Sequence, residues 1–365
     1  MQPIADPIVT FRRVQKTYDG ENLIVKDLNL DVARGEFLTL LGPSGSGKTT
    51  CLMMLAGFET PTGGEIRLDG QRIDTVPPHK RGIGMVFQNY ALFPHMTVGE
   101  NLRFPLAVRK LPAAEIDAKV KRALEMVQLH EFAGRYPQQL SGGQQQRIAL
   151  ARALVFEPKL VLMDEPLGAL DKQLREHMQL EIKHIHQSLG VTFVFVTHDQ
   201  SEALTMSDRI AVFDKGVIQQ IDRPDALYDA PANAFVASFI GENNALDGRI
   251  EQDDGDSCGV RLADGSFLKA ANGGVGRSGE AAMLSIRPER VRIVADADGA
   301  NRLPAQVEEL IYLGDHLRIR LRVAGSTTFT VKTPVSRLDR SPGAGQLVHV
   351  EIAPEHIRAL APMPA

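Results

Sequence analysis

The glycine-rich run Gly42–Thr49 constrains this chain more than any other stretch. It matches the pattern G-x-x-x-x-G-K-[ST], follows an apolar run at 36–41 that is typical of a buried strand, and precedes a helix-forming stretch closed by Gly57. Glycines let backbone N–H groups turn inward, so that these groups and the positive end of the helix can bind phosphate. A dinucleotide-binding loop is excluded because its third glycine is missing. The run predicts a nucleoside-triphosphate site.

The expected phosphate contacts are divided among a lysine, a hydroxyl and the loop itself. Lys48 is expected to reach the β- and γ-phosphates, and the Thr49 hydroxyl to bind Mg²⁺. The other predicted contacts come from Gly42, Pro43, Ser44, Gly45, Ser46, Gly47 and Thr50.

Composition narrows the class of protein. A length of 365 residues predicts two or three domains, and 43% hydrophobic with 24% charged residues is typical of a soluble globular protein. A net charge of -4 disfavours bulk attraction to nucleic acid, and two cysteines provide no disulfide framework and suit a reducing cytosol. Residues 1–7 lack the parts of a signal peptide, and no apolar run approaches the length of a membrane span. A role at a membrane would therefore require another chain as the anchor.

Two acids follow the continuous apolar run at 160–163. A strand that is apolar throughout is buried on both faces, which predicts a parallel sheet covered by helices. The carboxyl ends of such strands are where this architecture binds ligands. Asp164 suits a Mg²⁺-bound role, and Glu165 suits the polarisation of a water. The alternative is a merely polar strand end, which the upstream phosphate loop disfavours.

A second apolar strand repeats this design. The run 191–197 ends in His198, and a helix predicted over 172–189 joins the two strands into a βαβ crossover. His198 is therefore expected at the same edge, within reach of a γ-phosphate. The histidines of the connecting helix are expected at the surface, and the two at 184 and 186 point to different faces, which disfavours a zinc site: His177, His184 and His186. Gln88 ends another apolar strand, where it is either simply solvated or directed at the metal or the attacking water.

The stretch Leu140–Arg147 opens with a helix-capping pattern. Ser141 and Gln144 satisfy the S-x-x-Q capping box of a helix predicted to run to Phe156. One interpretation is a good helix cap and nothing more. The other is a phosphate contact, because Gly142 and Gly143 leave the positive helix end bare.

Three further segments complete the pattern. Residues 89–135 are predicted to form a helical insertion with an apolar patch at Tyr90–Met96, and a helix over 113–129. The lone ring of Tyr18 either packs in a turn or stacks on a base. From about Gly241 the short alternating strands predict a small β-barrel, in which two stretches of strand pattern resemble a weak internal repeat.

In this order, the motifs closely resemble those of the ATP-binding-cassette ATPases of prokaryotic importers. The resemblance covers about residues 8–240 and rests on Gly42–Thr49, Gln88, Leu140–Arg147, Asp164–Glu165, Leu170–Asp171 and His198. The remainder resembles the OB-like TOBE barrel of such ATPases, through 285–289 and 312–315. The expected fold is an α/β P-loop NTPase cassette (1–240) with a helical subdomain at about 89–158, followed by a small all-β barrel domain (241–365).

The resemblance implies a role for each site residue. Tyr18 would stack on adenine, and Asp164 and Gln88 would assist Thr49 at Mg²⁺. Glu165 would be the general base, and His198 would contact the γ-phosphate. The nucleotide of a second copy would be faced by Ser141, Gly142, Gly143 and Gln144. Tyr90–Met96 would line the groove that receives a helix of the permease. The chain departs from the family pattern at Gly168, where serine is commoner. This departure puts only the dimer contact in doubt.

The implied ligands are ATP and Mg²⁺. The implied partners are a second copy, two transmembrane permease subunits and, indirectly, a periplasmic or extracellular solute-binding protein, at the cytoplasmic face of the bacterial inner membrane. Residues 239–244 and 312–315 resemble the polyamine and opine group, which favours a polyamine cargo over sugar, iron or oxyanion. Two alternatives stay open: a nucleic-acid ATPase, disfavoured by the single cassette and the absence of a heptad tract, and a regulatory role for the β domain.

Overall fold

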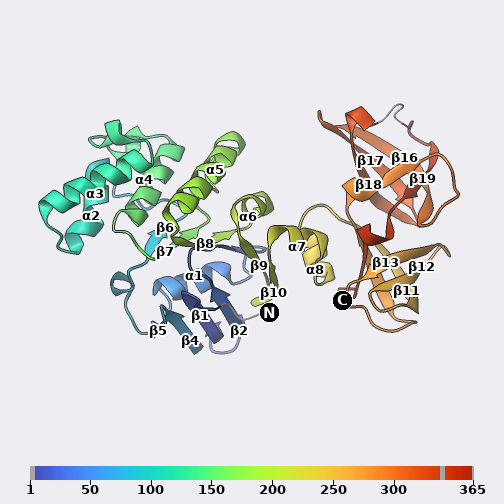
Figure 1. Cartoon of the computed structure of the whole chain (residues 1–365), viewed down its shortest axis with the longest axis horizontal. Helices are drawn as coiled ribbons and strands as arrows, with labels where there is room; N and C mark the ends of the chain where they lie inside the picture. The colour runs from blue at the N-terminus through green and yellow to red at the C-terminus, as the bar shows by residue number, and fades with distance from the viewer. Residues whose placement is uncertain (1–4, 338–341, 364–365) are drawn as a thin grey trace. The chain divides into compact units, whose positions relative to one another are not determined.

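The computed structural model describes residues 5–337 and 342–363. The chain divides into two compact units, Met1–Pro224 and Asp225–Ala365, each described by itself below (Figure 1). Residues 1–4 of the N-terminal stretch, and residues 338–341 and 364–365 of the predicted β domain, lie outside the described residues. No helix among the described residues is long and apolar enough to cross a bilayer.

The first unit contains an antiparallel sheet with the strand order β2-β1-β4-β5. Its strands are β1 (Val9–Thr17), β2 (Leu23–Val32), β4 (Gly63–Leu68) and β5 (Gln71–Arg72). Val9 and Phe11 of β1 are buried and pair with Val32 and Leu30 of β2. Buried residues alternate with less buried ones along much of β1, as expected for a sheet with one buried face.

The second sheet has six strands in the order β10-β9-β3-β8-β7-β6, all parallel except β10. Its strands are β3 (Phe37–Leu41), β6 (Gly84–Val86), β7 (Leu160–Asp164), β8 (Thr192–Thr197), β9 (Arg209–Asp214) and β10 (Val217–Asp222). Successive residues face two different cores: Phe193 and Phe195 of β8 join one, Val194 and Val196 the other. This burial on both faces explains the continuous apolar runs.

The helices of the first unit are α1 (Lys48–Ala56), α2 (Val98–Val108), α3 (Ala113–Met126), α4 (Gly142–Leu154), α5 (Lys172–Leu189) and α6 (Gln200–Met206). Helices α2, α3 and α4 pack on one another (green in Figure 1), so the predicted helical insertion is present. The α3 residues Ile116, Val120 and Leu124 are buried, as the periodicity predicts. The predicted α/β cassette fold is confirmed.

One histidine prediction is wrong. His186 of α5 was interpreted as a surface residue, whereas its side chain is buried. Its Nε2 lies 3.0 Å from the carbonyl oxygen of Gly35, and its ring packs against Phe37 and Phe193. Burial lowers the pKa of His186. The error arose because the spacing of two histidines does not reveal which helix face covers the sheet.

The second unit contains a closed five-stranded barrel, which confirms the predicted all-β domain. The barrel order is β11-β12-β13-β20-β14, with β11 (Asn244–Asp253), β12 (Ser257–Leu262), β13 (Phe267–Asn272), β14 (Ala281–Ile286) and β20 (Ile357–Leu360). The last strand, β20, runs parallel to β13 and antiparallel to β14. The barrel is therefore closed by residues from the far end of the chain.

The second unit also contains a separate β-sheet, which the sequence pattern did not distinguish from the barrel. Between β14 and β20 the chain forms an additional five-stranded sheet, in the order β15-β19-β16-β17-β18. Its strands are β15 (Arg292–Val294), β16 (Arg302–Tyr312), β17 (His316–Val323), β18 (Ser326–Pro334) and β19 (Leu347–Glu351). Four consecutive antiparallel strands have the same order in both bodies, β14-β11-β12-β13 and β19-β16-β17-β18, which agrees with the weak internal repeat in the strand pattern; only the fifth strand is placed differently. One hydrophobic core contains buried residues of both bodies.

Two short helices, α7 (Pro224–Asp229) and α8 (Ala234–Phe239), precede the barrel. The compact units divide between Pro224 and Asp225, so both helices fall almost entirely in the second unit. The physical reason is packing: residues of α8 share a small core with the barrel, formed by Ala234, Ala237, Met283 and Leu360.

Arg287 fastens this helical segment to the barrel. Its buried guanidinium donates hydrogen bonds to the carbonyl oxygens of Tyr228 (2.9 Å), Ala237 (3.0 Å) and Glu242 (3.1 Å). It also lies 4.3 Å from the centre of the Tyr228 ring. Burial lowers the pKa of Arg287, whereas the nearby charges of Glu289 and Asp229 oppose that effect. The hydrogen bonds to the three carbonyl oxygens offset part of the cost of desolvation.

Replacing Arg287 with methionine is expected to lower the free energy of unfolding of the second unit by about 3 kcal/mol, because buried carbonyl oxygens lose their donor. Hydrogen exchange of the α8 and β14 amides in the full chain measures this effect. The matched control is Arg290→Met, since Arg290 is exposed and only 3.5 Å from Asp229, and it should change stability by less than about 0.5 kcal/mol. Equal effects of both changes would refute the fastening role.

Candidate functional site

The phosphate loop connects β3 to α1 and needs its glycines for two different reasons. A Cβ added at Gly42 would lie 2.3 Å from the carbonyl oxygen of Phe213, so that strand end has no room for a side chain. Gly47 has a φ of 100° and forms the N-cap of α1. A left-handed backbone at this point is costly for other residues. The sequence pattern thus reflects close packing and a turn that exposes the start of α1.

Lys48 is buried over its own loop, with only 4% of the residue exposed. Its Nζ donates to the carbonyl oxygens of Gly42 (2.8 Å) and Pro43 (2.8 Å) and lies 3.3 Å from Ser46 Oγ. Burial lowers the pKa of Lys48, and the nearby acids Glu165 and Asp164 oppose that effect. Within the described part of the chain, no carboxylate forms an ion pair with this buried ammonium, which fits the recognition of an anionic ligand.

Thr49 and Asp164 meet across the sheet edge. The Thr49 hydroxyl donates to Asp164 Oδ1 at 3.1 Å, which joins the start of α1 to the end of β7. Burial raises the pKa of Asp164, whereas the Thr49 hydrogen bond and Lys48 oppose the rise. A hydroxyl and a carboxylate are hard oxygen donors of the kind that Mg²⁺ prefers, so these two residues fit that ion.

Glu165 and His198 form the second contact of the site. His198 Nδ1 lies 3.2 Å from Glu165 Oε1. The backbone N–H of Glu165 donates to the carbonyl oxygen of Val196, so the ladder between β7 and β8 positions this residue. The φ of Glu165 is 43°, an uncommon value for a residue other than glycine. This left-handed residue lies directly after the end of β7, and its carboxylate contacts His198.

The capping box at Ser141 is present. Ser141 N donates to Gln144 Oε1 at 2.9 Å, and Gln144 N donates to Ser141 Oγ at 3.3 Å. Gly143 is close to α5, because an added Cβ would lie 3.1 Å from Leu174. Among the described residues, no hydrogen bond or ion pair joins Ser141–Gln144 to the phosphate loop. A single copy therefore leaves this helix end separate from the other site residues.

Tyr18 and Gln88 likewise lie apart from Lys48 and the other residues at the edge of the sheet. Tyr18 is 62% exposed, and Lys16 Nζ lies 4.8 Å from the centre of its ring. Gln88 is exposed just after β6, and within residues 5–337 and 342–363 it makes no hydrogen bond to Thr49 or Asp164. The chain alone thus brings together the phosphate loop with Lys48 and Thr49, the acids Asp164 and Glu165, and His198. It leaves Tyr18, Gln88 and Ser141–Gln144 apart from them.

The apolar patch at Tyr90–Met96 differs from its prediction in one residue. Tyr90 is buried at 6% exposure and belongs to the core of the helical part, so it does not line a surface groove. Arg152 fixes the backbone at the start of this patch by donating hydrogen bonds to the carbonyl oxygens of Tyr90 and Ala91, both at 2.8 Å. The remaining patch includes Phe93, whose ring lies 4.8 Å from that of the exposed Phe104.

Sequence reasoning missed Arg175, Asp199 and Glu202. These residues interact beside His198 in the folded chain, with Arg175 on α5 and Glu202 on α6. A weak signal existed: Asp199 precedes a short helix as an N-cap residue would, and its side chain accepts from Ser201 N. Nothing in the spacing links this position to Arg175, because only the packing of α5 against α6 brings the two together.

Gly168 has room for the serine that is commoner there. An added Cβ would meet only the carbonyl oxygen of Glu165, at 3.5 Å, which is an ordinary contact distance. Gly168→Ser is therefore expected to change the free energy of unfolding by less than about 0.5 kcal/mol, measured by urea unfolding followed by circular dichroism. Gly42→Ser is the matched control and should cost about 1–3 kcal/mol, because its Cβ would clash with Phe213. A destabilised Gly168→Ser chain contradicts this account.

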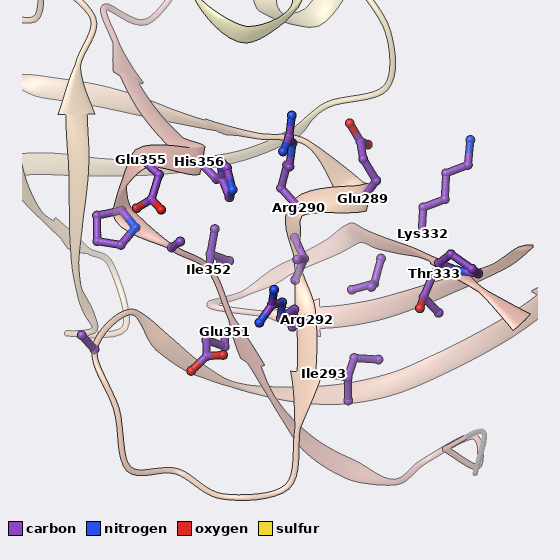
Figure 2. Close-up of a pocket in the computed structure, with 16 residues that line it drawn as sticks. Glu289, Arg290, Arg292, Ile293, Lys332, Thr333, Glu351, Ile352, Glu355 and His356 are labelled. Carbon is purple, nitrogen blue, oxygen red and sulfur yellow. The ribbon is translucent and has the colours of Figure 1, made fainter. Parts of the chain in front are cut away.

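The second unit contains a cavity of about 980 Å³ between β15, β18, β19 and two 3₁₀ turns, η4 (Pro288–Arg290) and η6 (Pro354–His356). Figure 2 shows basic and acidic side chains interspersed along its wall. Its formal charges cancel: Arg290, Arg292 and Lys332 stand against Glu289, Glu351 and Glu355. On charge alone, the cavity favours neither an anion nor a cation. Unlike the phosphate loop, it has no excess charge to select a ligand.

Comparison with known proteins agrees with this geometry. The ABC transporter family model matches residues 25–168, and the TOBE domain model matches residues 284–360. The spermidine/putrescine import ATP-binding protein PotA 1 of Pseudomonas aeruginosa is 50% identical over 333 residues, covering 89% of this chain and 90% of the relative. PotA of Thermobifida fusca is 46% identical over 358 residues, covering 96% and 93%.

Solved structures extend the comparison to the fold. The ATP-binding cassette MJ0796, a dimer in a post-hydrolysis state bound to ADP and Pi, is 35% identical with a TM-score of 0.53, covering 59% of this chain and 98% of that one. The cbiO1 protein of Clostridium perfringens, part of an ABC transporter complex, is 28% identical with a TM-score of 0.57, covering 61% and 91%. The phosphate loop, the sheet that carries it and relatives that span nearly the whole chain lead to one conclusion: the chain belongs to the ABC transporter family, as an ATP-hydrolysing subunit with a C-terminal TOBE domain.

Proposed function

We propose that this chain is the ATPase subunit of an importer whose cargo is a polyamine of the spermidine and putrescine kind. The observation that carries the cargo is the 46–50% identity to PotA proteins over both units of the chain. The similarity covers 90% and 93% of the length of these two relatives. Similarity that includes the TOBE domain is more specific than similarity confined to the cassette, whose ATP-binding residues do not contact a cargo.

The roles of the site residues follow from their positions. Lys48 would exchange its contacts with the loop carbonyls for phosphate oxygens, to which an ammonium forms stronger, charge-assisted hydrogen bonds. Thr49 and Asp164 would hold Mg²⁺, with Gln88 as a further ligand. When bound, that ion neutralises charge on the phosphate oxygens. These residues bind the triphosphate and do not themselves move protons.

Proton transfer is assigned to Glu165. Its carboxylate lies at the sheet edge beside Thr49 and Asp164, where it would accept a proton from the attacking water. His198, 3.2 Å from Glu165, would donate a hydrogen bond to the γ-phosphate and keep the carboxylate oriented. Tyr18 would stack on the adenine ring, and its high exposure leaves that face available.

The complete site is proposed to need two copies. Ser141–Gln144 makes no contact with the phosphate loop of its own chain, and the cassette MJ0796 is a dimer. The helix end of one copy, capped by Ser141 and bare at Gly142 and Gly143, would face the phosphates bound by the other. Because ATP would then contact both copies, it would favour the closed dimer by population shift.

The proposed partners are two transmembrane permease subunits, which hold the dimer at the cytoplasmic face of the inner membrane, and indirectly a solute-binding protein outside it. Phe58 and Phe104 are exposed on the cassette, and Phe93 lies against Phe104. These rings would receive a permease helix in place of the buried Tyr90. The second unit is proposed to support the dimer or to regulate it, and no nucleic acid is proposed as a ligand.

Uptake tests this function. Cells that express the chain with the permease and solute-binding protein encoded beside it should accumulate radiolabelled spermidine and putrescine, and cells with Glu165→Gln should not. Excess unlabelled polyamine should compete, whereas sugars, iron chelates and oxyanions should not. Competition by one of those solutes alone would reassign the cargo. ATPase activity that responds to DNA or ribosomes and ignores the permease would overturn the transport function.

A further inference from the structure

His198 lies in a turn, residues 197–199, that is held from both flanks. The Thr197 hydroxyl donates to Glu202 Oε2 at 2.5 Å and accepts from Asp199 N at 3.0 Å. Asp199 in turn caps the N-terminus of α6. The imidazole of His198 is itself largely exposed, so its direction depends on this backbone turn more than on packing.

One guanidinium joins this turn to a different part of the site. Arg175 Nη1 lies 3.2 Å from Asp199 Oδ2, its Nη2 donates to the carbonyl oxygen of Leu170 at 3.0 Å, and its Nε lies 3.8 Å from Glu202 Oε1. The Nε atom is buried and has no hydrogen-bond partner at normal distance. Arg175 therefore spans three groups from three segments. A linear side chain with one charged atom could not contact all of them.

The Leu170 carbonyl belongs to the loop that continues from Glu165. Gly168 N donates to the carbonyl oxygen of Glu165 at 3.3 Å, and Leu170 N donates to that of Leu167 at 3.1 Å. The contacts thus close a ring: Glu165, its following loop, Arg175, the 197–199 turn, His198, and back to Glu165 over 3.2 Å. Through these contacts the loop, Arg175 and the 197–199 turn are linked to the Glu165–His198 pair.

Glu202 adds a buried carboxylate beside Arg175 and the 197–199 turn. It is 3% exposed, and burial raises its pKa to about 6. The groups that face it are the Thr197 hydroxyl, Asp199, Arg175 and His198. Near neutral pH the carboxylate is therefore ionised, and its negative charge favours the orientation of Arg175 toward the turn.

We infer that Arg175, supported by Glu202, is a positioning residue that holds His198 against Glu165 and couples both to the loop at 167–170. The inference rests on the proposed role of His198 in hydrolysis. It assigns Arg175 no contact with ATP. The loop at 167–170 carries the departure Gly168, so this ring is also the route by which a change in that loop reaches the reacting atoms.

The decisive measurement is steady-state ATP hydrolysis by the full-length chain with Mg²⁺. Arg175→Met should lower kcat about tenfold and leave KM for ATP within about twofold, because the ring is loosened while the phosphate loop is untouched. Arg175→Lys should give an intermediate loss, since one ammonium cannot reach all three groups. The matched control is Lys183→Met: Lys183 Nζ donates to the Thr205 carbonyl oxygen at 2.6 Å and so also ties α5 to α6, but away from His198. It should change kcat less than about twofold.

A double-mutant cycle separates positioning from general stability. In a His198→Ala background, Arg175→Met should cause less than about a twofold further loss, because the residue through which it acts is already gone. A full additional tenfold loss would overturn the inference, and so would an equal loss in Lys183→Met. Wild-type turnover in His198→Ala would instead refute the proposed site itself, which makes the two failures distinguishable.

The pH dependence provides a second readout that does not require a disruptive variant. Glu202→Gln resembles the protonated acid, so the ratio of wild-type to variant kcat should be about threefold at pH 8 and approach one below pH 5, where both side chains are neutral. The ratio cancels titrations that both proteins share. A ratio that is constant across this range would overturn the support by Glu202. If Arg175→Met does not fold, the Arg175→Lys and Glu202→Gln results decide in the same way.

Discussion

Glu165→Gln is expected to lower kcat for ATP hydrolysis about a thousandfold while the Kd for ATP stays within about twofold. The amide has the shape of the carboxylate and can still contact His198 from 3.2 Å, but it cannot accept a proton from water. The phosphate loop, which supplies the binding energy, is not altered. Single-turnover hydrolysis and equilibrium binding, both on the full chain with Mg²⁺, measure the two quantities separately. With hydrolysis blocked, ATP should also retain the closed dimer longer.

A matched control for this change is Glu181→Gln on α5. The side chain of Glu181 is about as exposed as that of Glu165, at 25% against 22%, and its contacts are with His177 and Arg147 at 3.8 Å. Its removal should change kcat less than about twofold. Near-normal turnover by Glu165→Gln would remove Glu165 from the base role and leave His198 as the nearest candidate.

Lys48→Ala is expected to raise the Kd for ATP at least about a hundredfold. Charge-assisted hydrogen bonds contribute about 1.5–3 kcal/mol each, and each 1.4 kcal/mol corresponds to a factor of ten. Lys48 is also held in place in advance by Gly42 and Pro43, so little conformational entropy is lost on binding. Isothermal titration with ATP and Mg²⁺ measures the change.

Two comparisons make the Lys48 result interpretable. Lys159→Ala removes an exposed lysine that pairs with Asp69, and it should leave the Kd for ATP within about twofold. An unchanged circular-dichroism spectrum of Lys48→Ala would show that the fold is retained. If Lys48→Ala binds ATP as tightly as the unchanged chain, the phosphate loop is not the principal nucleotide contact, and the proposed site is wrong.

Much of the cassette could be predicted from local sequence, because the starts and ends of its helices and strands have clear sequence signals. The helix predicted over 172–189 has those bounds in α5, and the capping box predicted at Ser141 is formed by the expected two hydrogen bonds. Gly57 ends α1 with a left-handed φ of 91°. Each of these features depends on residues within one turn of helix or strand, so the signal is contained in a short window.

The errors share a different cause. Tyr90 and His186 were placed on the surface, yet both are buried by elements distant in sequence. The barrel is closed by β20, which begins at Ile357 and pairs with strands far earlier in the chain. Helix α8 belongs to the second unit because it packs on the barrel. In each case the sequence does not show which helix or strand packs against which other one.

By itself, the sequence determined the chemistry of the phosphate loop, the order of the strands and helices, and the family. Spacing and residue type act over a few positions, and hydrogen bonds within a helix cap or glycine turn need nothing from the remainder of the chain. Only the tertiary structure decided that Thr49 meets Asp164, that Glu165 meets His198, and that Arg175 connects their two loops. Those contacts join residues more than a hundred positions apart in one case, and burial in a shared core is what holds them together.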